Sequence, residues 1–239
     1  MSKHEILNTN DHADLRIHTG AGAELGDAVM AALAVPDEFR KVQAHYPIVF
    51  RREAGSGRFS ALALFGFENG ENLFLANDKW EARYRPLSMD IQPFLVGLPH
   101  DHGADGQVHV DMGHPRISAS GEGIRVFDET GRATPFLETI TEKLGALHVG
   151  YQESGAFYDA LARHDLLEPF TLEVPLSDGS NQSLIGFHII NEDKLRALDA
   201  DALGSLHEDG YLMPIFMALA SLSNLSELIA RKDAKQARG

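Results

Sequence analysis

The chain has 239 residues, of which 44% are hydrophobic, so it is long and apolar enough to bury a sizeable core. Its 35 Asp and Glu residues outnumber its 21 Lys and Arg residues, and the resulting net charge of −14 argues against DNA or RNA binding. It has no cysteine, which excludes disulfides, thiolate nucleophiles and zinc–thiolate or iron–sulfur sites.

The N-terminal segment is polar. Residues 1–20 lack hydrophobic periodicity, which predicts a flexible arm. The first 14 residues are interrupted by charges and contain no apolar stretch of signal-peptide length. The longest uninterrupted apolar runs, such as 61–67, fall far short of the roughly 20 residues that a membrane span needs. We therefore expect a cytoplasmic protein without membrane insertion.

The first half of the chain changes from helical to strand-like periodicity. Leu25, Val29 and Leu33 recur at helical spacing and predict a helix over residues 21–34. Proline followed by acids at 36–38 indicates the start of another. Five strands are then predicted, at 47–51, 59–67, 72–76, 93–97 and 107–112. Turn residues join the first two strands as a hairpin, and a polar loop at 99–106 precedes the last.

The second half contains both kinds of element. Residues 125–127 predict a short strand, and two helices follow, at 134–147 and from Phe157 to near Asp165. Segments 170–176 and 183–190 predict a second hairpin. Asp199 is the predicted cap of a helix that stops at Gly210. An apolar stripe from Ile215 to Ile229 predicts a long C-terminal helix.

Because the strands come in hairpins, the pattern predicts an α+β fold with a largely antiparallel sheet packed against helices, including the long C-terminal helix. No linker interrupts the chain, which predicts a single domain over residues 21–231 and a frayed tail at 232–239. The two hairpins share a similar local pattern. An internal duplication, with halves near 36–120 and 121–231, is therefore an alternative.

His109-Val110-Asp111 is the sharpest chemical candidate. Alternate side chains of a strand share a face, so His109 and Asp111 would point the same way, as ligands do in a two-His-one-carboxylate Fe(II) site. His188 or His164 would supply the second imidazole. Three more histidines raise the local density: His100, His102 and His114. An HxD tripeptide is common by chance, so a chain without a cofactor is the first interpretation and Fe(II) the alternative.

Asp111 and Arg116 form a second candidate pair. A carboxylate at a strand end with an arginine five residues later favours a structural ion pair that holds the intervening loop. In the functional alternative, the guanidinium of Arg116 binds a ligand carboxylate through two hydrogen bonds.

A third group combines aromatic and cationic side chains. Trp80, Arg83 and Tyr84 have the residue types that clamp a peptide or planar ligand, although a lone tryptophan also fills cores. His45 is interpreted as a positioning hydrogen-bond partner. Met213 and Met217 on the terminal stripe favour covering the protein's own sheet, with docking of another protein as the alternative.

Several blocks, in this order and spacing, resemble the SapC family. They are His45-Tyr46-Pro47-Ile48-Val49-Phe50, Asn72-Leu73-Phe74 with Trp80 and Tyr84, Asp111 to Arg116, Arg125 to Gly131 with Pro135, and Ser221-Leu222-Ser223-Asn224-Leu225. The resemblance spans roughly residues 39–231. It implies a role near envelope traffic: surface-layer export in name, with relatives often found beside TonB-dependent receptors and tryptophan-halogenase-like flavoproteins. Family members tend to have an apolar residue at the position of His109, which argues against this histidine as a family-wide ligand.

Two functional hypotheses follow. The first is a soluble SapC-like accessory or binding protein that is not an enzyme and recognises a peptide or partner protein. The residues expected to bind are Trp80, Arg83, Tyr84, His45, Asp111 and Arg116. The alternative is an iron-dependent oxygenase-like enzyme with His109, Asp111 and His188 as metal ligands. A homo-oligomer formed through the C-terminal helix is a third interpretation.

Overall fold

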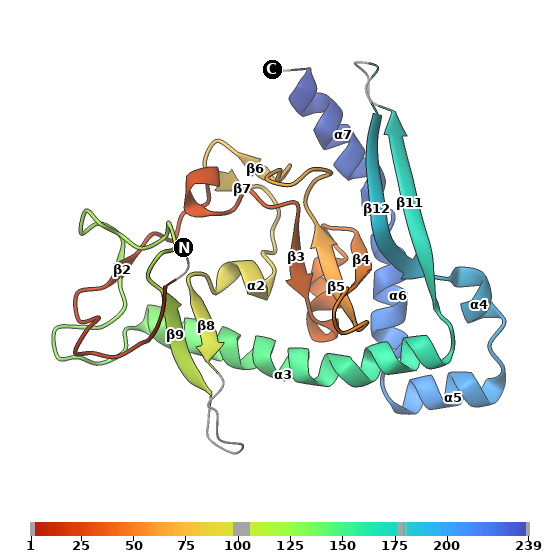
Figure 1. Ribbon diagram of the computed structural model, residues 1–239, viewed down its shortest axis with the longest axis horizontal. Coiled ribbons are helices and arrows are strands. Elements are labelled where there is room, and N and C mark those ends of the chain that lie inside the picture. Colours follow the sequence, from red (N-terminus) through yellow and green to blue (C-terminus); the bar gives the residue numbers. More distant parts are fainter. Residues whose placement is uncertain (1–2, 98–105, 176–178, 180, 238–239) are drawn as a thin grey trace. The chain divides into compact units, whose positions relative to one another are not determined.

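The computed structural model describes residues 3–97, 106–175, 179 and 181–237, and it confirms an α+β fold with antiparallel sheets and a long C-terminal helix (Figure 1). The chain forms two compact units. Unit 1 comprises Met1–Ala28, Leu75–Trp80 and Leu87–Val149, and unit 2 comprises Val29–Phe74, Glu81–Pro86 and Gly150–Gly239. The single domain over residues 21–231 stays a prediction, because compactness alone does not tell whether either unit folds by itself.

Unit 1 is organised around a three-stranded antiparallel sheet with the order β1–β9–β8. These strands are β1 (His4–Ile6), β8 (Phe94–Gly97) and β9 (Gln107–Asp111). Val110 of the central strand lies opposite Glu5 on one side and Phe94 on the other. Two short antiparallel pairs complete the strands of this unit: β2 (Arg16–Ile17) with β10 (Ile124–Arg125), and β6 (Leu75–Ala76) with β7 (Lys79–Trp80). Residues 1–20, predicted as an arm without regular structure, therefore contain two strands.

The core of unit 1 lies between this sheet, the β2–β10 pair and helices. The short helix α2 (Leu87–Asp90) leads into β8, and α3 (Pro135–Arg163) begins in this unit. Ten buried apolar residues pack together: Leu15, Ile17, Ile91, Phe94, Val110, Val126, Phe127, Leu137, Ile140 and Leu144. Leu15 and Ile17 thus belong to the core, which explains why β2 forms.

The prediction of a helix over residues 21–34 is wrong. Only the 3-10 turn η1 (Ala23–Leu25) is helical, and the segment ends in the strand β3 (Ala31–Ala34). β3 pairs along its whole length with β5 (Phe59–Leu64), and Ala32 and Ala34 are buried. The intrinsic preference of alanine for helices amounts to less than about 1 kcal/mol per residue. Burial and strand pairing outweigh it here.

Unit 2 contains a five-stranded antiparallel sheet with the order β11–β12–β4–β5–β3. Both predicted hairpins are present, as β4 (Ile48–Arg52) with β5 and as β11 (Leu167–Pro175) with β12 (Asn181–Ile190). The two hairpins lie side by side, because Phe187 and His188 of β12 pair with Arg51 and Phe50 of β4. An internal duplication of the hairpins stays a prediction.

One helix replaces the two that the sequence predicts over residues 134–147 and 157–165. α3 runs unbroken from Pro135 to Arg163 despite three internal glycines. Gly150 allows close packing, since a Cβ atom there would lie 2.8 Å from Cγ2 of Val35. Further along α3, the Tyr158 hydroxyl accepts a hydrogen bond from the N–H of Ala61 in β5, at 3.0 Å. Packing within unit 2 thus stabilises this part of the helix, although glycine has a low helix propensity.

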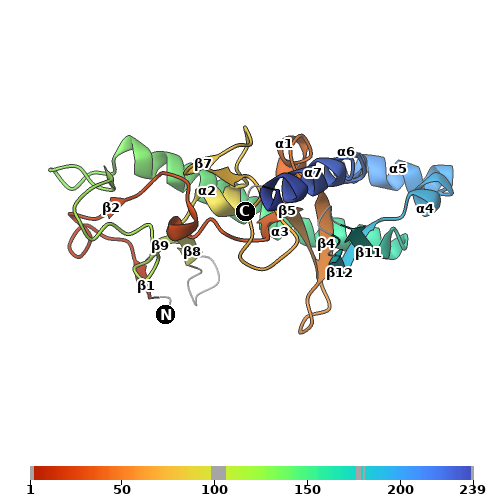
Figure 2. The same cartoon turned by 90° about the horizontal axis from the view of Figure 1, so that it is seen from above.

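The remaining helices of unit 2 are η2 (Pro36–Glu38), α1 (Phe39–Val42), α4 (Glu192–Arg196), α5 (Ala200–Glu208), α6 (Leu212–Ser221) and α7 (Asn224–Gln236). Asp199 caps α5 as predicted, accepting the N–H of Ala202 at 2.9 Å. α6 packs on β4 and β12, and α7 follows it after two residues (Figure 2). Lys232 of α7 is buried and donates to Glu68 and Glu71 at 2.7 and 2.9 Å. This charged contact anchors the end of the predicted C-terminal helix.

Candidate functional site

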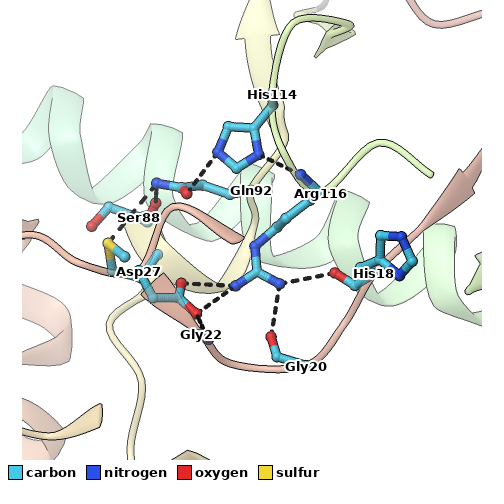
Figure 3. Close-up of polar contacts among 9 residues, drawn as sticks. His18, Gly20, Gly22, Asp27, Ser88, Gln92, His114 and Arg116 are labelled. Carbon is cyan, nitrogen blue, oxygen red and sulfur yellow. Dashed lines mark hydrogen bonds and ion pairs between the residues drawn. The ribbon is translucent and has the colours of Figure 1, made fainter. Parts of the chain in front are cut away.

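The guanidinium of Arg116 lies at the centre of a buried polar cluster in unit 1 (Figure 3). Its Nη2 donates to both carboxylate oxygens of Asp27, at 2.7 and 2.8 Å. Its Nη1 donates to the carbonyl oxygens of His18 and Gly20, each at 2.9 Å. The side chains of Arg116 and Asp27 are 3% and 0% exposed, so both charges are removed from water and neutralised by each other.

Asp27 also shapes its own loop. One carboxylate oxygen accepts the N–H of Gly22 at 3.0 Å, and the N–H of Asp27 donates back to the Gly22 carbonyl at 3.2 Å. The loop from His18 to Asp27 therefore presents two carbonyls and one carboxylate to the same guanidinium. We call Arg116, Asp27 and these acceptors the arginine centre.

The predicted pairing of Asp111 with Arg116 is wrong. Arg116 pairs with Asp27, 89 residues earlier in the chain, a partner that sequence spacing could not reveal. The Asp111 carboxylate instead accepts the backbone N–H groups of Lys3, at 2.7 Å, and Gly113, at 3.0 Å. Asp111 thus ties the N-terminal segment to the turn that follows β9.

His114 extends the arginine centre. The N–H of Arg116 donates to Nδ1 at 3.2 Å, so Nδ1 carries no proton and Nε2 donates to Gln92 Oε1 at 3.1 Å. Burial lowers the pKa of His114 below its usual value, and the positive charge of Arg116 lowers it further, although Asp111 and Asp27 oppose this. The imidazole is therefore a neutral link between the loop after β9 and the residues that precede β8.

The arginine centre has the properties of a structural element. Both terminal nitrogens of Arg116 are committed to protein acceptors, and only Nε lacks a partner among the described residues. No pair of guanidinium N–H groups therefore remains to bind a ligand carboxylate through two hydrogen bonds. Ligand binding by Arg116 and Asp111 stays a prediction, and the contacts support the structural interpretation.

The three residues of the iron hypothesis lie in two units. His109 and Asp111 belong to β9 of unit 1, and His109 packs on Gly97, where a Cβ atom would lie 2.1 Å from Nε2. His188 belongs to β12 of unit 2, and its ring meets Phe59 edge-on at 5.0 Å. Burial lowers the pKa of His188, and the charge of Arg52 lowers it further.

Among the described residues, no group of three or more His, Asp or Glu side chains is arranged to hold a metal ion. His100 and His102 lie outside the residues that the structure describes. Iron binding through His109, Asp111 and His188 therefore stays a prediction, to be decided by metal analysis.

The predicted aromatic and cationic group is divided between the units. Trp80 pairs with Leu75 across the β6–β7 ribbon of unit 1 and is half-buried. In unit 2, the Tyr84 hydroxyl donates to the Glu38 carboxylate at 2.6 Å, and the Tyr84 carbonyl accepts the Tyr46 hydroxyl. The polar groups of Tyr84 are thus engaged in holding its own segment.

Two further residues of this predicted group, His45 and Arg83, interact electrostatically. Burial lowers the pKa of His45, and the charge of Arg83 lowers it further. Arg83 itself is exposed. Binding by Trp80, Arg83, Tyr84 and His45 stays a prediction.

An open pocket of about 360 Å³ in unit 2 lies where η2, α1, α3 and the α5–α6 loop meet. Phe39, Phe157 and Tyr211 form an aromatic row along it, with ring centroids 6.2 Å apart for the first pair and 5.5 Å for the second. Met213 and Met217 of α6 complete the apolar lining. We call this cavity the α6 pocket.

The rim of the α6 pocket is charged. Asp37 of η2, Glu153 of α3 and Asp209 at the end of α5 contribute carboxylates, and Arg40 of α1 contributes one cation. All four residues are exposed. The sequence predicts the methionines as a stripe of the terminal helix, but the rim comes from three distant segments and has no signal in the sequence.

A sequence model of the SapC family matches residues 7–228 of this chain. The chain belongs to the SapC family. No curated protein and no solved structure matches it.

Two of the SapC-like blocks meet in unit 2. Ser221, where α6 ends, accepts the N–H of Ile48 at the start of β4 at 2.8 Å and donates to the Ala218 carbonyl. Asn224, the first residue of α7, donates to the Gln43 carbonyl at 2.8 Å. The Ser-Leu-Ser-Asn block of this SapC-family chain thus fastens the terminal helices to the segment that leads into the sheet.

The terminal helices also bear on membrane insertion. By length and composition alone, Leu212–Gln236 is apolar enough to cross a membrane, and 22% of its most apolar window is buried. Ser221, Ser223 and Asn224 interrupt its apolar residues, so the segment contains no long uninterrupted apolar run. One such helix is a weak indication, since core helices pass the same test. The absence of membrane insertion stays a prediction for this SapC-family chain.

Proposed function

We propose that this SapC-family chain is an accessory protein without enzymatic activity, which recognises a peptide or partner protein in a system of envelope export or uptake. The α6 pocket carries this proposal. Its volume of about 360 Å³ lies within the range of roughly 300–1,000 Å³ in which proteins accommodate small molecules or the anchoring side chains of a partner.

The surface beside the pocket supports a macromolecular partner. Met213 and Phe216 of α6 are 55% and 51% exposed, although neighbouring Ile215 and Ala218 are buried in the core. These two side chains are three positions apart on α6, so they share one helix face and offer apolar contact area to a partner. The methionine side chains adapt their shape, which suits recognition of varied apolar anchors.

Site-specific photo-crosslinking tests this proposal. The full chain carrying Met213→p-benzoylphenylalanine is mixed with the purified products of neighbouring genes and irradiated. The matched control is Ile185→p-benzoylphenylalanine, because Ile185 is 71% exposed on β12 and does not line the pocket.

A cross-link formed from position 213 and not from position 185 would support recognition through the α6 pocket. Equal cross-linking from both positions, or none from position 213, would contradict it. A cross-link between two copies of the chain at position 213 would replace the proposal with a homo-oligomer formed through the C-terminal helices.

A further inference from the structure

The apolar part of the α6 pocket is well suited to one side chain of a partner. Phe39 and Phe157 are buried at 0% and 1% exposure, so this part of the lining is fixed by the core of unit 2. Tyr211 and Met213 are more exposed and border the opening. An apolar or aromatic side chain placed here would contact rings and methionine sulfur, both of which bind such groups favourably.

The charges around this lining are unbalanced. Three carboxylates, of Asp37, Glu153 and Asp209, face one cation, of Arg40. Within the described part of the chain, none of these three carboxylates takes part in a salt bridge or a side-chain hydrogen bond. The acidic rim is therefore available to an incoming cation, unlike the carboxylate of Asp27, which Arg116 already neutralises.

The Tyr211 side chain lies in the same negative field. Burial raises the pKa of Tyr211, and the charge of Asp209 raises it further. Asp159 and Glu153 also raise the pKa of Tyr211, whereas Arg163 opposes them. The balance is a region that favours positive charge next to an aromatic ring, where a cation gains additional stabilisation.

We infer that the α6 pocket binds a segment of a partner protein in which a lysine or arginine stands beside an apolar side chain. This inference deepens the proposed function and rests on it. The apolar side chain fills the space lined by Phe157, Tyr211 and Met217, and the cation faces the carboxylates of Glu153 and Asp209. A segment with glutamates in place of the cations would be repelled by the same rim.

Peptide binding to the full chain tests this charge preference. The probes are three short fluorescein-labelled peptides of leucine and phenylalanine that differ only in their polar residues, which are lysine, glutamine or glutamate. Fluorescence anisotropy gives the Kd of each. The lysine peptide should bind at least about tenfold more tightly than the glutamine peptide, and added salt should weaken it.

Charge reversal at the rim makes the test specific to the pocket. The double variant Glu153→Lys/Asp209→Lys should weaken binding of the lysine peptide by about tenfold and strengthen binding of the glutamate peptide. The matched control is Glu173→Lys, because Glu173 is an exposed carboxylate on β11 outside the pocket. It should leave both affinities within about twofold.

The possible outcomes separate this inference from the proposed function. If the glutamine or glutamate peptide binds as tightly as the lysine peptide, or if Glu173→Lys acts like the double variant, the charge preference is wrong. Binding of no peptide also overturns it. In each case a cross-link from position 213 to a partner would still support the α6 pocket as a recognition site.

Discussion

The arginine centre of unit 1 and the α6 pocket of unit 2 use charge in opposite ways. Asp27 is fully buried and paired with Arg116, which also binds two backbone carbonyls. Glu153 and Asp209 are exposed and, within the described residues, have no ion-pair partner. A buried charge must be satisfied inside the protein, whereas an exposed one remains available to a partner. The arginine centre is therefore structural, and the α6 pocket is the surface that we propose for recognition.

The largest expected effect is the loss of Arg116. Arg116→Met removes the guanidinium that pairs with the buried Asp27 carboxylate and should lower the free energy of unfolding by about 3–5 kcal/mol. Urea denaturation measures this change. Arg196→Met is the control, because Arg196 forms only exposed pairs, and it should cost less than about 1 kcal/mol.

A double variant sharpens this first prediction. Asp27→Leu/Arg116→Met removes both charges and should destabilise less than the sum of the two single changes. Strictly additive losses would show that the two side chains do not act as a pair, and the structural role assigned to the arginine centre would then fail.

Lys232 is a buried charged residue of unit 2, and its substitution tests whether its ion pair with Glu71 is structural. Lys232→Met leaves Glu71, which is 8% exposed, without its main partner and should cost about 2 kcal/mol in urea denaturation. Lys235→Met should cost less than about 0.5 kcal/mol, because the Lys235 side chain is 60% exposed. Equal effects of the two changes would contradict the anchoring role of Lys232.

The pH dependence of stability reports on His114. Its folded pKa lies below the usual value of 6.5, so the unfolded chain binds the proton more readily. The stability that neutral His114 contributes is present above pH 6.5 and is lost as the pH falls toward the folded pKa. This single group contributes a slope of at most about 1.4 kcal/mol per pH unit.

His114→Asn removes the titration but keeps an acceptor near the N–H of Arg116. Urea denaturation between pH 7.5 and pH 5.5 should therefore show a flatter pH dependence for this variant than for the original chain. His45 and His188 also have lowered pKa values, so some dependence should remain. An unchanged slope would show that His114 does not couple the arginine centre to pH.

The rim of the α6 pocket should contribute least to stability. Glu153→Lys/Asp209→Lys should change the free energy of unfolding by no more than about 0.5 kcal/mol, while it weakens peptide binding about tenfold. A loss of stability comparable to that of Arg116→Met would show that these carboxylates stabilise the fold, and the two regions would then not differ in their use of charge.

The iron content of the protein should be the same with and without the Asp111 carboxylate. Protein purified without a histidine tag should fold and contain far less than one iron per chain, and Asp111→Ala should not alter that content. Stoichiometric iron that is lost in Asp111→Ala would support the oxygenase alternative with His109 and His188.

Local patterns predicted the hairpins because their cues lie close together in the sequence. The strands predicted at 47–51 and 59–67 around a glycine turn, and at 170–176 and 183–190, appear as the pairs β4–β5 and β11–β12. Asp199 is likewise a cap that acts on a residue three positions away. Patterns failed at residues 21–34, where Ala-rich periodicity predicted a helix and pairing with β5 produced a strand.

Candidate sites were less predictable than strands. Asp111 was correctly placed at the end of its strand and Arg116 in the turn that follows, but Arg116 pairs with a residue 89 positions away. The α6 pocket draws on segments near residues 37, 153 and 209, and only its methionines stood out in the sequence. Spacing along the chain carries no information about such distant neighbours.

The sequence by itself determined the SapC family, the α+β class, the excess of negative charge and the positions of the hairpins. Each depends on composition, on residue order or on interactions within a few positions. Only the tertiary structure decided which charges are buried in pairs and which surround an open apolar pocket. That distinction depends on burial, because the same carboxylate is costly to leave unpaired in the core and tolerable in water.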